Sequence, residues 1–244
     1  MKFSKFLIIY LTTFFLNLEV YAASGDADEY KITIKKVELC ETGSTPANCL
    51  NPVTLFEGDS GAIDIASATA GATAASLGTL AAATLGTTYT HIQTTMNRAA
   101  TISGYASNAA DNICKTGEGT AGNTSINAVG TFHASNTSNS AQTILIGEAE
   151  ADNLPEYMNG VTAAGVFGPD GDLSGDTEYT MMAHRLALTA PITITLGKLP
   201  TVTMAFSTVG ALGLAGNNEA HCTAGDAATG LYGAEPTITL SITN

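Results

Sequence analysis

Residues 30–39 of the chain read Tyr30-Lys-Ile-Thr-Ile-Lys-Lys-Val-Glu-Leu39. Apolar and polar residues alternate up to Lys35, the alternation slips by one residue at Lys36, and it resumes on the other phase with Val37 and Leu39. A period of two is the pattern of a strand with one buried face. A slip of one residue is typical of a β-bulge. The stretch therefore predicts a long, bulged strand near the start of the fold.

The rest of the chain repeats this pattern in shorter runs. Residues 88–103 form the longest candidate in the first half, with Ile92, Met96, Ala100 and Ile102 on one face. Further strands are expected at 52–56, 62–65, 128–134, 142–146, 180–188, 192–196, 202–206 and 238–242. Turn-forming residues separate these runs, and none of them resembles a strand–helix–strand unit. The pattern predicts an all-β protein, an antiparallel β-sandwich of the prealbumin or immunoglobulin type with long loops rich in Gly, Ser, Thr and Asn.

The first 22 residues have the parts of a secretory signal peptide. Lys2 and Lys5 precede an apolar run at 6–16, and Val20-Tyr21-Ala22 provides small or β-branched residues for cleavage after Ala22. The apolar run is shorter than the roughly 20 residues of a membrane-spanning helix. We expect an exported protein, located extracellularly, at the cell surface or in the periplasm. The mature part, 23–244, is expected to be one sandwich domain with a loose leader at 23–28 and a loop-rich insertion at about 107–178.

The chain is strongly acidic, with 22 acidic and 9 basic residues and a formal net charge of −13. A surface of this charge repels nucleic acid and anionic lipid, so neither is an expected partner. The acidic balance suits a protein that stays soluble outside the cell.

Four cysteines lie in the mature part, at Cys40, Cys49, Cys114 and Cys222. An even number of cysteines in an exported protein points to disulfides, and four cysteines allow three pairings. Proximity favours Cys40–Cys49, which would leave Cys114 to pair with Cys222. The chain has no Cys-x-x-Cys motif and its four His residues are scattered, which disfavours a zinc site.

One acidic segment matches the first half of a calcium-binding loop. Its candidate ligands are Asp170, Asp172, Ser174, Asp176 and Glu178. Oxygen ligands at alternate positions suit Ca²⁺, and Gly175 stands at the sixth position, where a sharp turn is needed. The twelfth position, where a bidentate Glu belongs, is Met181, so a further ligand such as Glu156 or Asp152 would be required. The alternative is a solvated acidic turn.

No catalytic motif is complete. Residues 58–61 read Gly-Asp-Ser-Gly, as around the nucleophile of chymotrypsin-like proteases, and 220–222 read Ala-His-Cys, but their order is reversed relative to that family. The simpler interpretation of 58–61 is a turn, and we expect no catalytic residues. Tyr89 and Tyr105 are candidates for a sugar-stacking face, with core packing as the alternative.

Several segments together resemble an uncharacterised family of bacterial exported domains with a prealbumin-like β-sandwich. They are Tyr30–Leu39, Val53-Thr-Leu55, Ile63-Asp-Ile65, Leu77-Gly-Thr-Leu80 and Gly86–Ile92. The resemblance covers about 65 residues well and implies the sandwich fold; the family has no known catalytic residues to carry over. The chain departs from it at Gln93, where the family usually has a basic residue, and in its cysteines.

A second, compositional likeness is to pilus subunits of the chaperone–usher kind, which are exported, contain a disulfide and end in an alternating strand, here 237–243. We expect an exported, non-catalytic structural, filament or adhesion module of the cell surface. The alternatives are a calcium-dependent or carbohydrate-binding surface module and a secreted enzyme of unknown class. Self-association, or binding to other surface proteins, is expected through edge strands at the two ends of the domain. The candidate assembly residues are Tyr30, Ile32, Ile34, Ile238, Leu240 and Ile242.

Overall fold

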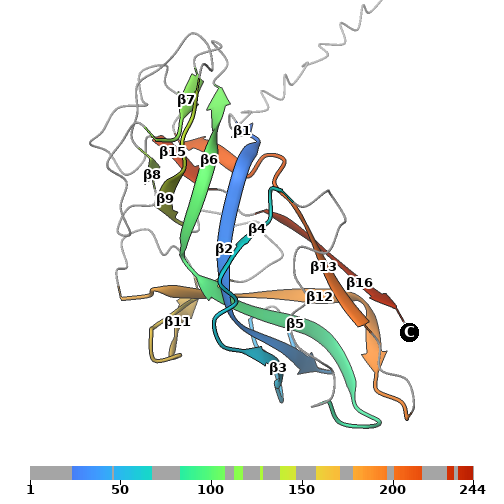
Figure 1. Cartoon of the computed structure of the whole chain (residues 1–244). Coiled ribbons are helices and arrows are strands. Elements are labelled where there is room, and N and C mark those ends of the chain that lie inside the picture. The colour runs from blue at the N-terminus through green and yellow to red at the C-terminus, as the bar shows by residue number, and fades with distance from the viewer. Residues whose placement is uncertain are drawn as a thin grey trace, which may run out of the picture.

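The computed structural model describes residues 24–45, 47–67, 83–107, 113–117, 127–128, 138–146, 158–170, 178–196, 201–215, 230–233 and 236–243. These residues form antiparallel strands arranged in one large sheet and two small ones (Figure 1). The predicted antiparallel all-β sandwich is confirmed. In this part of the chain no helix has the length and apolar character needed to cross a membrane. The predicted signal peptide, 1–22, lies outside the described residues.

The large sheet contains ten strands and the small sheets contain four and two. In the large sheet are β2 (Ala27–Glu41), β3 (Val53–Glu57), β4 (Ala62–Asp64), β5 (Thr88–Asn97), β6 (Ala99–Ser107), β7 (Ile113–Lys115), β9 (Gln142–Leu145), β10 (Met158–Val161), β11 (Phe167–Asp170) and β12 (Met181–Thr193). The four-stranded sheet consists of β1 (Ser24–Gly25), β14 (Leu212–Ala215), β15 (Gly230–Gly233) and β8 (Asn127–Ala128). The two-stranded sheet pairs β13 (Thr201–Ser207) with β16 (Thr237–Thr243). In the segment predicted as a loop-rich insertion, β9 matches the strand expected at 142–146, whereas β7, β10 and β11 were not predicted from the sequence.

The large sheet is built on one long ribbon. Strand β2 runs antiparallel to β6 with its first half and to β5 with its second half. The register shifts between Ile34, opposite Met96, and Lys36, opposite Thr95, so the bulge predicted from the sequence is confirmed. The buried set changes phase at the same place, from Tyr30, Ile32 and Ile34 to Val37 and Leu39. The bulge therefore keeps one face of a bent strand in the core along its whole length.

Arg98 is the single residue between β5 and β6, where the sheet divides. Beside β5 lies β12, and beside β6 lies β9. The Arg98 backbone N–H donates to the carbonyl of Thr180 at 3.0 Å, and its carbonyl accepts from the N–H of Ile146 at 2.7 Å. Its side chain, 1% exposed, donates from Nε to the carbonyl of Ile146 and from Nη1 to that of Tyr179, both at 3.0 Å. Arg98 thereby ties together the two ladders that diverge from it.

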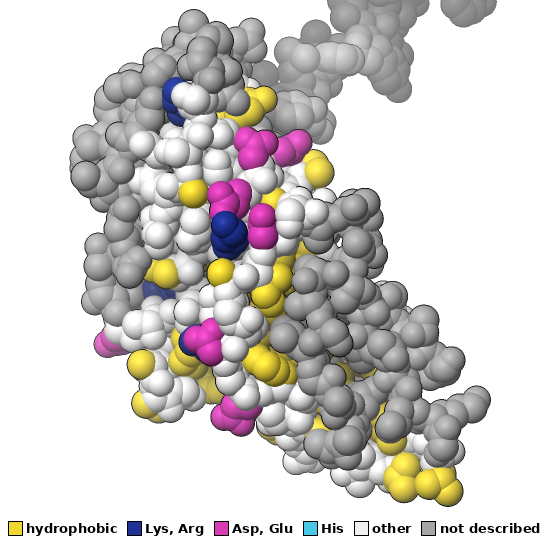
Figure 2. Space-filling view, in the orientation of Figure 1, with side chains coloured by type: hydrophobic (Ala, Val, Ile, Leu, Met, Phe, Trp, Pro, Cys, Tyr) yellow, Lys and Arg dark blue, Asp and Glu magenta, His cyan; other side chains and the backbone are white. Residues whose placement is uncertain are grey.

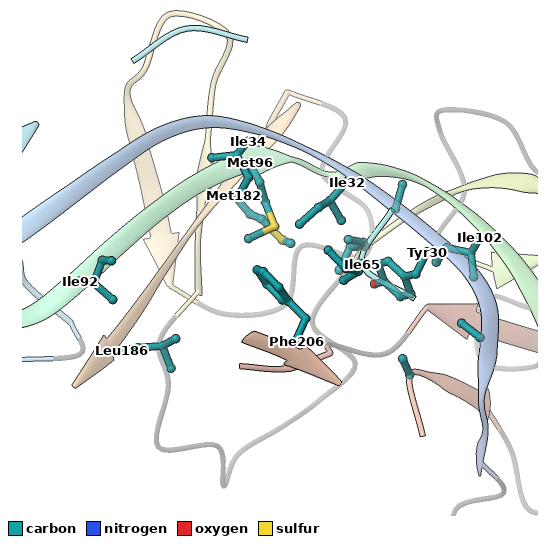
Figure 3. Close-up of a cluster of buried hydrophobic side chains, with 14 of the residues drawn as sticks. Tyr30, Ile32, Ile34, Ile65, Ile92, Met96, Ile102, Met182, Leu186 and Phe206 are labelled. Carbon is teal, nitrogen blue, oxygen red and sulfur yellow. The ribbon is translucent and has the colours of Figure 1, made fainter. Parts of the chain in front are cut away.

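The small sheets form the second layer over the concave side of the ribbon. From β13, Phe206 points toward Met96 and Met182 (Figure 3) and is 6% exposed. From the four-stranded sheet, Leu212 and Leu231 join the same buried cluster. The two small sheets thus close one continuous apolar core against opposite halves of the large sheet.

Residues 24–28 are fixed by partners from another strand rather than loose. Gly25 of β1 pairs with Leu212 of β14, and the Asp26 carboxylate accepts from the backbone N–H of Gly210 at 3.0 Å. A Cβ added to Gly25 would lie 1.8 Å from the backbone oxygen of Tyr105, so only glycine fits this close approach. The expectation of a loose leader at 23–28 is wrong for residues 24–28. The reason is that their partners come from a distant strand, which local sequence does not reveal.

The packing of the two-stranded sheet can be tested at Phe206. Replacing this side chain by alanine should lower the free energy of unfolding by about 3 kcal/mol, because removal of a large buried ring leaves a cavity between the layers. Denaturant titration followed by circular dichroism measures the change. The control is Val209→Ala, at a side chain 73% exposed in the next turn, which should change stability by less than about 0.5 kcal/mol. Equal effects of the two substitutions would contradict this packing.

Candidate functional site

Among the described strands, β13 and β16 have the longest backbone edges that are not paired with another strand. The two strands pair in continuous register from Thr201 opposite Thr243 to Ser207 opposite Thr237. Within the described residues each is the other's only ladder partner, so each presents one unpaired edge. An unpaired edge offers a row of N–H and C=O groups to which another strand can add.

The other edges in the described residues are shorter or interrupted. Strands β4 and β7 have three residues each, and β1 and β8 have two. Strand β3 has five residues, and β11 has four, including Pro169, which has no N–H to offer. The part of β12 that extends beyond β10 contains Pro191 and a register shift. Strands β13 and β16 have seven residues each, and their prolines, Pro200 and Pro236, precede the strands, which makes theirs the longest uninterrupted edge described.

The second of the two predicted assembly strands lies in this sheet. Ile238, Leu240 and Ile242 occupy the β16 positions in register with Phe206, Met204 and Val202 of β13. These three β16 residues come from the alternating run that the sequence singled out.

The first predicted assembly strand is not an edge, which corrects the sequence-based expectation. Strand β2 has β6 and β5 on one side and β4 and β3 on the other. Its Tyr30, Ile32 and Ile34 are 0%, 1% and 2% exposed, and all three belong to the core. Alternation reports one buried face and says nothing about the two backbone edges, so an interior strand and an edge strand look alike in the sequence.

On the face of the large sheet opposite the core, a buried polar row that sequence reasoning missed crosses three strands. Glu38 of β2, Gln93 of β5 and Arg185 of β12 stand opposite one another in register. The Gln93 amide nitrogen donates to Glu38 at 2.6 Å, and Arg185 Nε donates to the Gln93 amide oxygen. Lys36 pairs with the other Glu38 oxygen at 2.7 Å, and the Arg185 guanidinium lies over the ring of Phe167 at 5.5 Å. Hydrogen bonds and an ion pair connect the side chains of the row. Their polar groups therefore pair with one another rather than with a ligand.

An amide at position 93 suits the polar row. An amide donates to the carboxylate of Glu38 with its nitrogen and accepts from Arg185 with its oxygen. A basic side chain there would satisfy Glu38 but place a second cation beside Arg185, which is 5% exposed.

A disulfide joins Cys40, at the end of β2, to Cys49. The Glu41 N–H donates to the carbonyl of Leu50 at 2.9 Å, and Ser44 Oγ accepts from the Leu50 N–H at 2.9 Å. The pairing that proximity favoured is therefore confirmed.

Only one cysteine of the second predicted disulfide lies in the described residues. Cys114 of β7 is 2% exposed and disulfide-bonded. Its expected partner, Cys222, lies outside the described residues, so the Cys114–Cys222 bond stays a prediction.

The candidate calcium loop lies mostly outside the described residues. Asp170 ends β11, and Glu178 is an exposed residue shortly before β12. Asp172, Ser174 and Asp176 fall in the segment between them that is not described. In the part of the chain that the structure covers, no three His, Cys, Asp or Glu side chains gather as a metal site. Calcium binding stays a prediction.

The protease-like motif at 58–61 is a turn tied to β2. Ser60 Oγ accepts from the Ile34 N–H at 2.9 Å and donates to the Gly61 carbonyl at 2.7 Å. Lys35 Nζ lies 2.6 Å from the Asp59 carboxylate and, together with the Gly61 N–H, holds the pKa of Asp59 below its usual value. The side chains of this motif are used to anchor the turn; His221 lies outside the described residues.

The two tyrosines considered for sugar stacking have different environments. Tyr89 is 1% exposed in the core, and its hydroxyl accepts from the Thr84 N–H at 3.2 Å. Tyr105 is 37% exposed on β6, a different part of the ribbon. They do not form one stacking face.

No protein-family model, curated protein or solved structure matches this chain. The likeness to exported prealbumin-like domains therefore rests on the sequence segments alone.

The Cys40–Cys49 disulfide should stabilise the fold. The variant Cys40→Ser/Cys49→Ser should unfold with a free energy lower by about 2–3 kcal/mol, since the bond closes a short loop in the unfolded chain. Denaturant titration of both proteins measures this, and replacing both cysteines avoids a stray thiol. Alkylation of the native protein without reductant, followed by mass spectrometry, should find no modified cysteine. Equal stabilities, or labelled cysteines in native material, would contradict a structural bond.

Calcium binding is tested by thermal melting. If Asp170, Asp172, Ser174, Asp176 and Glu178 hold an ion, Ca²⁺ should raise the melting temperature, because a ligand that binds only the folded state stabilises it. Asp172→Ala should abolish the rise, whereas Glu57→Ala, at an exposed acid on β3, should keep it. Identical melting curves in calcium and in chelator would identify the segment as a solvated acidic turn.

Proposed function

We propose that this chain is an exported, non-catalytic protein of the cell surface that self-associates by strand addition, as a unit of a filament or adhesive layer. The observation that carries the proposal is the seven-residue open edge of the β13–β16 sheet. Exported assemblies commonly join by adding a strand from a neighbour to such an edge, where backbone hydrogen bonds supply affinity.

Two further features support the proposal. The N-terminal residues have the composition of a signal peptide, and disulfides such as Cys40–Cys49 persist in oxidising compartments outside the cytoplasm. The longest described edge also lacks the devices that usually block strand addition, since β13 and β16 contain neither proline nor a charged residue.

The test compares assembly of the parent protein with that of an edge variant. Purified mature protein should form species larger than a monomer, and Ser241→Lys on β16 should shift them toward the monomer, because a charge on an edge strand opposes pairing. Size-exclusion chromatography with light scattering measures the masses, and electron microscopy shows the form of the assemblies. Ala163→Lys, in the exposed turn between β10 and β11, is the matched control and should assemble like the parent.

A parent protein that stays monomeric at high concentration would contradict this function. A monomeric surface module that binds calcium or carbohydrate would then be the better account.

A further inference from the structure

One end of the molecule exposes large apolar side chains. Leu85, in the turn before β5, is 59% exposed, and Leu196, after β12, is 86% exposed. The two turns lie side by side, because the Gly86 N–H donates to the Ile194 carbonyl at 2.8 Å and the Ile194 N–H donates to the Thr87 carbonyl at 3.0 Å. We call residues 84–88 and 193–196 the uncharged end; it lies at the lower right of Figure 1, where β5 begins and β12 finishes.

The uncharged end contains no Asp, Glu, Lys or Arg. Its polar groups are mostly threonine hydroxyls, such as those of Thr88 and Thr193, which hydrogen-bond to each other at 2.7 Å. The sequence on both sides is equally poor in charge: 65–97 has no Asp, Glu, Lys or Arg, and Lys198 is the one such residue between Arg185 and Glu219. Within the described residues, Glu41 is close by along the ladder, since it stands opposite Tyr89.

Two further acidic residues of the described surface lie far from this end. Asp26 and Asp28 mark the other end of β2, where Asp26 holds the turn that follows β13. On the face shown in Figure 2, acidic side chains occur from the upper part down to the bottom, while the described atoms at the lower right end are apolar or uncharged. The described part of the uncharged end thus differs from the rest of this face, where acidic side chains are present.

This distribution of charge favours a second copy of the chain as the partner. Two copies with a net charge of −13 repel each other wherever their acidic surfaces meet, and the repulsion is smallest where no charge is present. Large apolar side chains that stand exposed together on a soluble protein commonly mark a contact surface. The uncharged end and the β13–β16 sheet lie in the same part of the molecule, since β12 contacts β16 and both strands end at the lower right of Figure 1.

We propose that the uncharged end, with Leu85 and Leu196 as its apolar anchors, binds a second copy of this chain beside the β13–β16 edge. This proposal rests on the self-association proposed above. It adds an apolar surface that would exclude water around the added strand. Backbone hydrogen bonds alone do not distinguish one partner strand from another, whereas apolar side chains flanking the edge select a copy that fits them.

The deciding variant is Leu85→Glu/Leu196→Glu. Both side chains are exposed, so the variant should fold and melt like the parent, which circular dichroism checks. Its apparent dissociation constant for assembly, measured by light scattering over a concentration series, should rise at least about tenfold, because two charges must lose water at the contact. Val166→Glu, at a side chain 61% exposed in the turn between β10 and β11, is the control and should leave assembly unchanged.

The outcomes separate this inference from the function on which it rests. If Ser241→Lys weakens assembly but the double glutamate variant assembles like the parent, strand addition stands and the role of the uncharged end is overturned. If the parent is monomeric, both proposals fail. Sedimentation with neutral phosphatidylcholine vesicles tests a lipid surface as the occupant: no binding is expected, and binding that the double glutamate variant loses would overturn the second copy as partner.

Discussion

The buried guanidinium of Arg98 holds together the point where the large sheet divides. A two-stranded ribbon of β2 against β5 and β6 cannot bend sharply and keep one neighbour along its whole outer side, so β12 and β9 separate at this residue. The division leaves backbone carbonyls of Ile146 and Tyr179 facing the interior, where an unsatisfied acceptor would be costly. A planar cation with several donors on a long stem reaches both of them. No apolar side chain could do so, and the three N–H groups of a lysine would all come from one nitrogen atom.

The rest of the architecture follows from that division. The ribbon has two halves that face different directions, so one flat second sheet cannot cover both. The protein instead covers each half with its own small sheet, one through Phe206 and the other through Leu212 and Leu231. Small sheets have proportionally more edge than large ones, and the described edge of β13–β16 is a direct result. The surface proposed for assembly is therefore linked to the same geometric constraint that makes the core continuous.

The sequence was most informative where a single local rule decides the structure. The bulge beside Lys36, the core face of β5 and β6, and the Cys40–Cys49 pair all follow from patterns within a few residues of one another. The interior position of β2 and the attachment of residues 24–28 depend on which other strands lie beside them. The alternation of apolar and polar residues does not show which strands pair. The polar row of Glu38, Gln93 and Arg185 was missed for a similar reason. Each of these residues looks like an ordinary solvent-facing position, and only the register brings the three together.

The pairing of β1 with β14 has a consequence for the order in which the fold forms. A chain exported N-terminus first presents Ser24 and Gly25 at the start of its passage, but their partners, Gly213 and Leu212, emerge only near the end. The ribbon of β2, β5 and β6 comes from the first half of the chain and has its own strands available long before then. Strand β16 emerges last of the described strands, and β13 must wait for it to form their sheet. If the chain is exported in this way, the second layer stays open until the last described strand has crossed, and the sheet with the unpaired edge is the last to form.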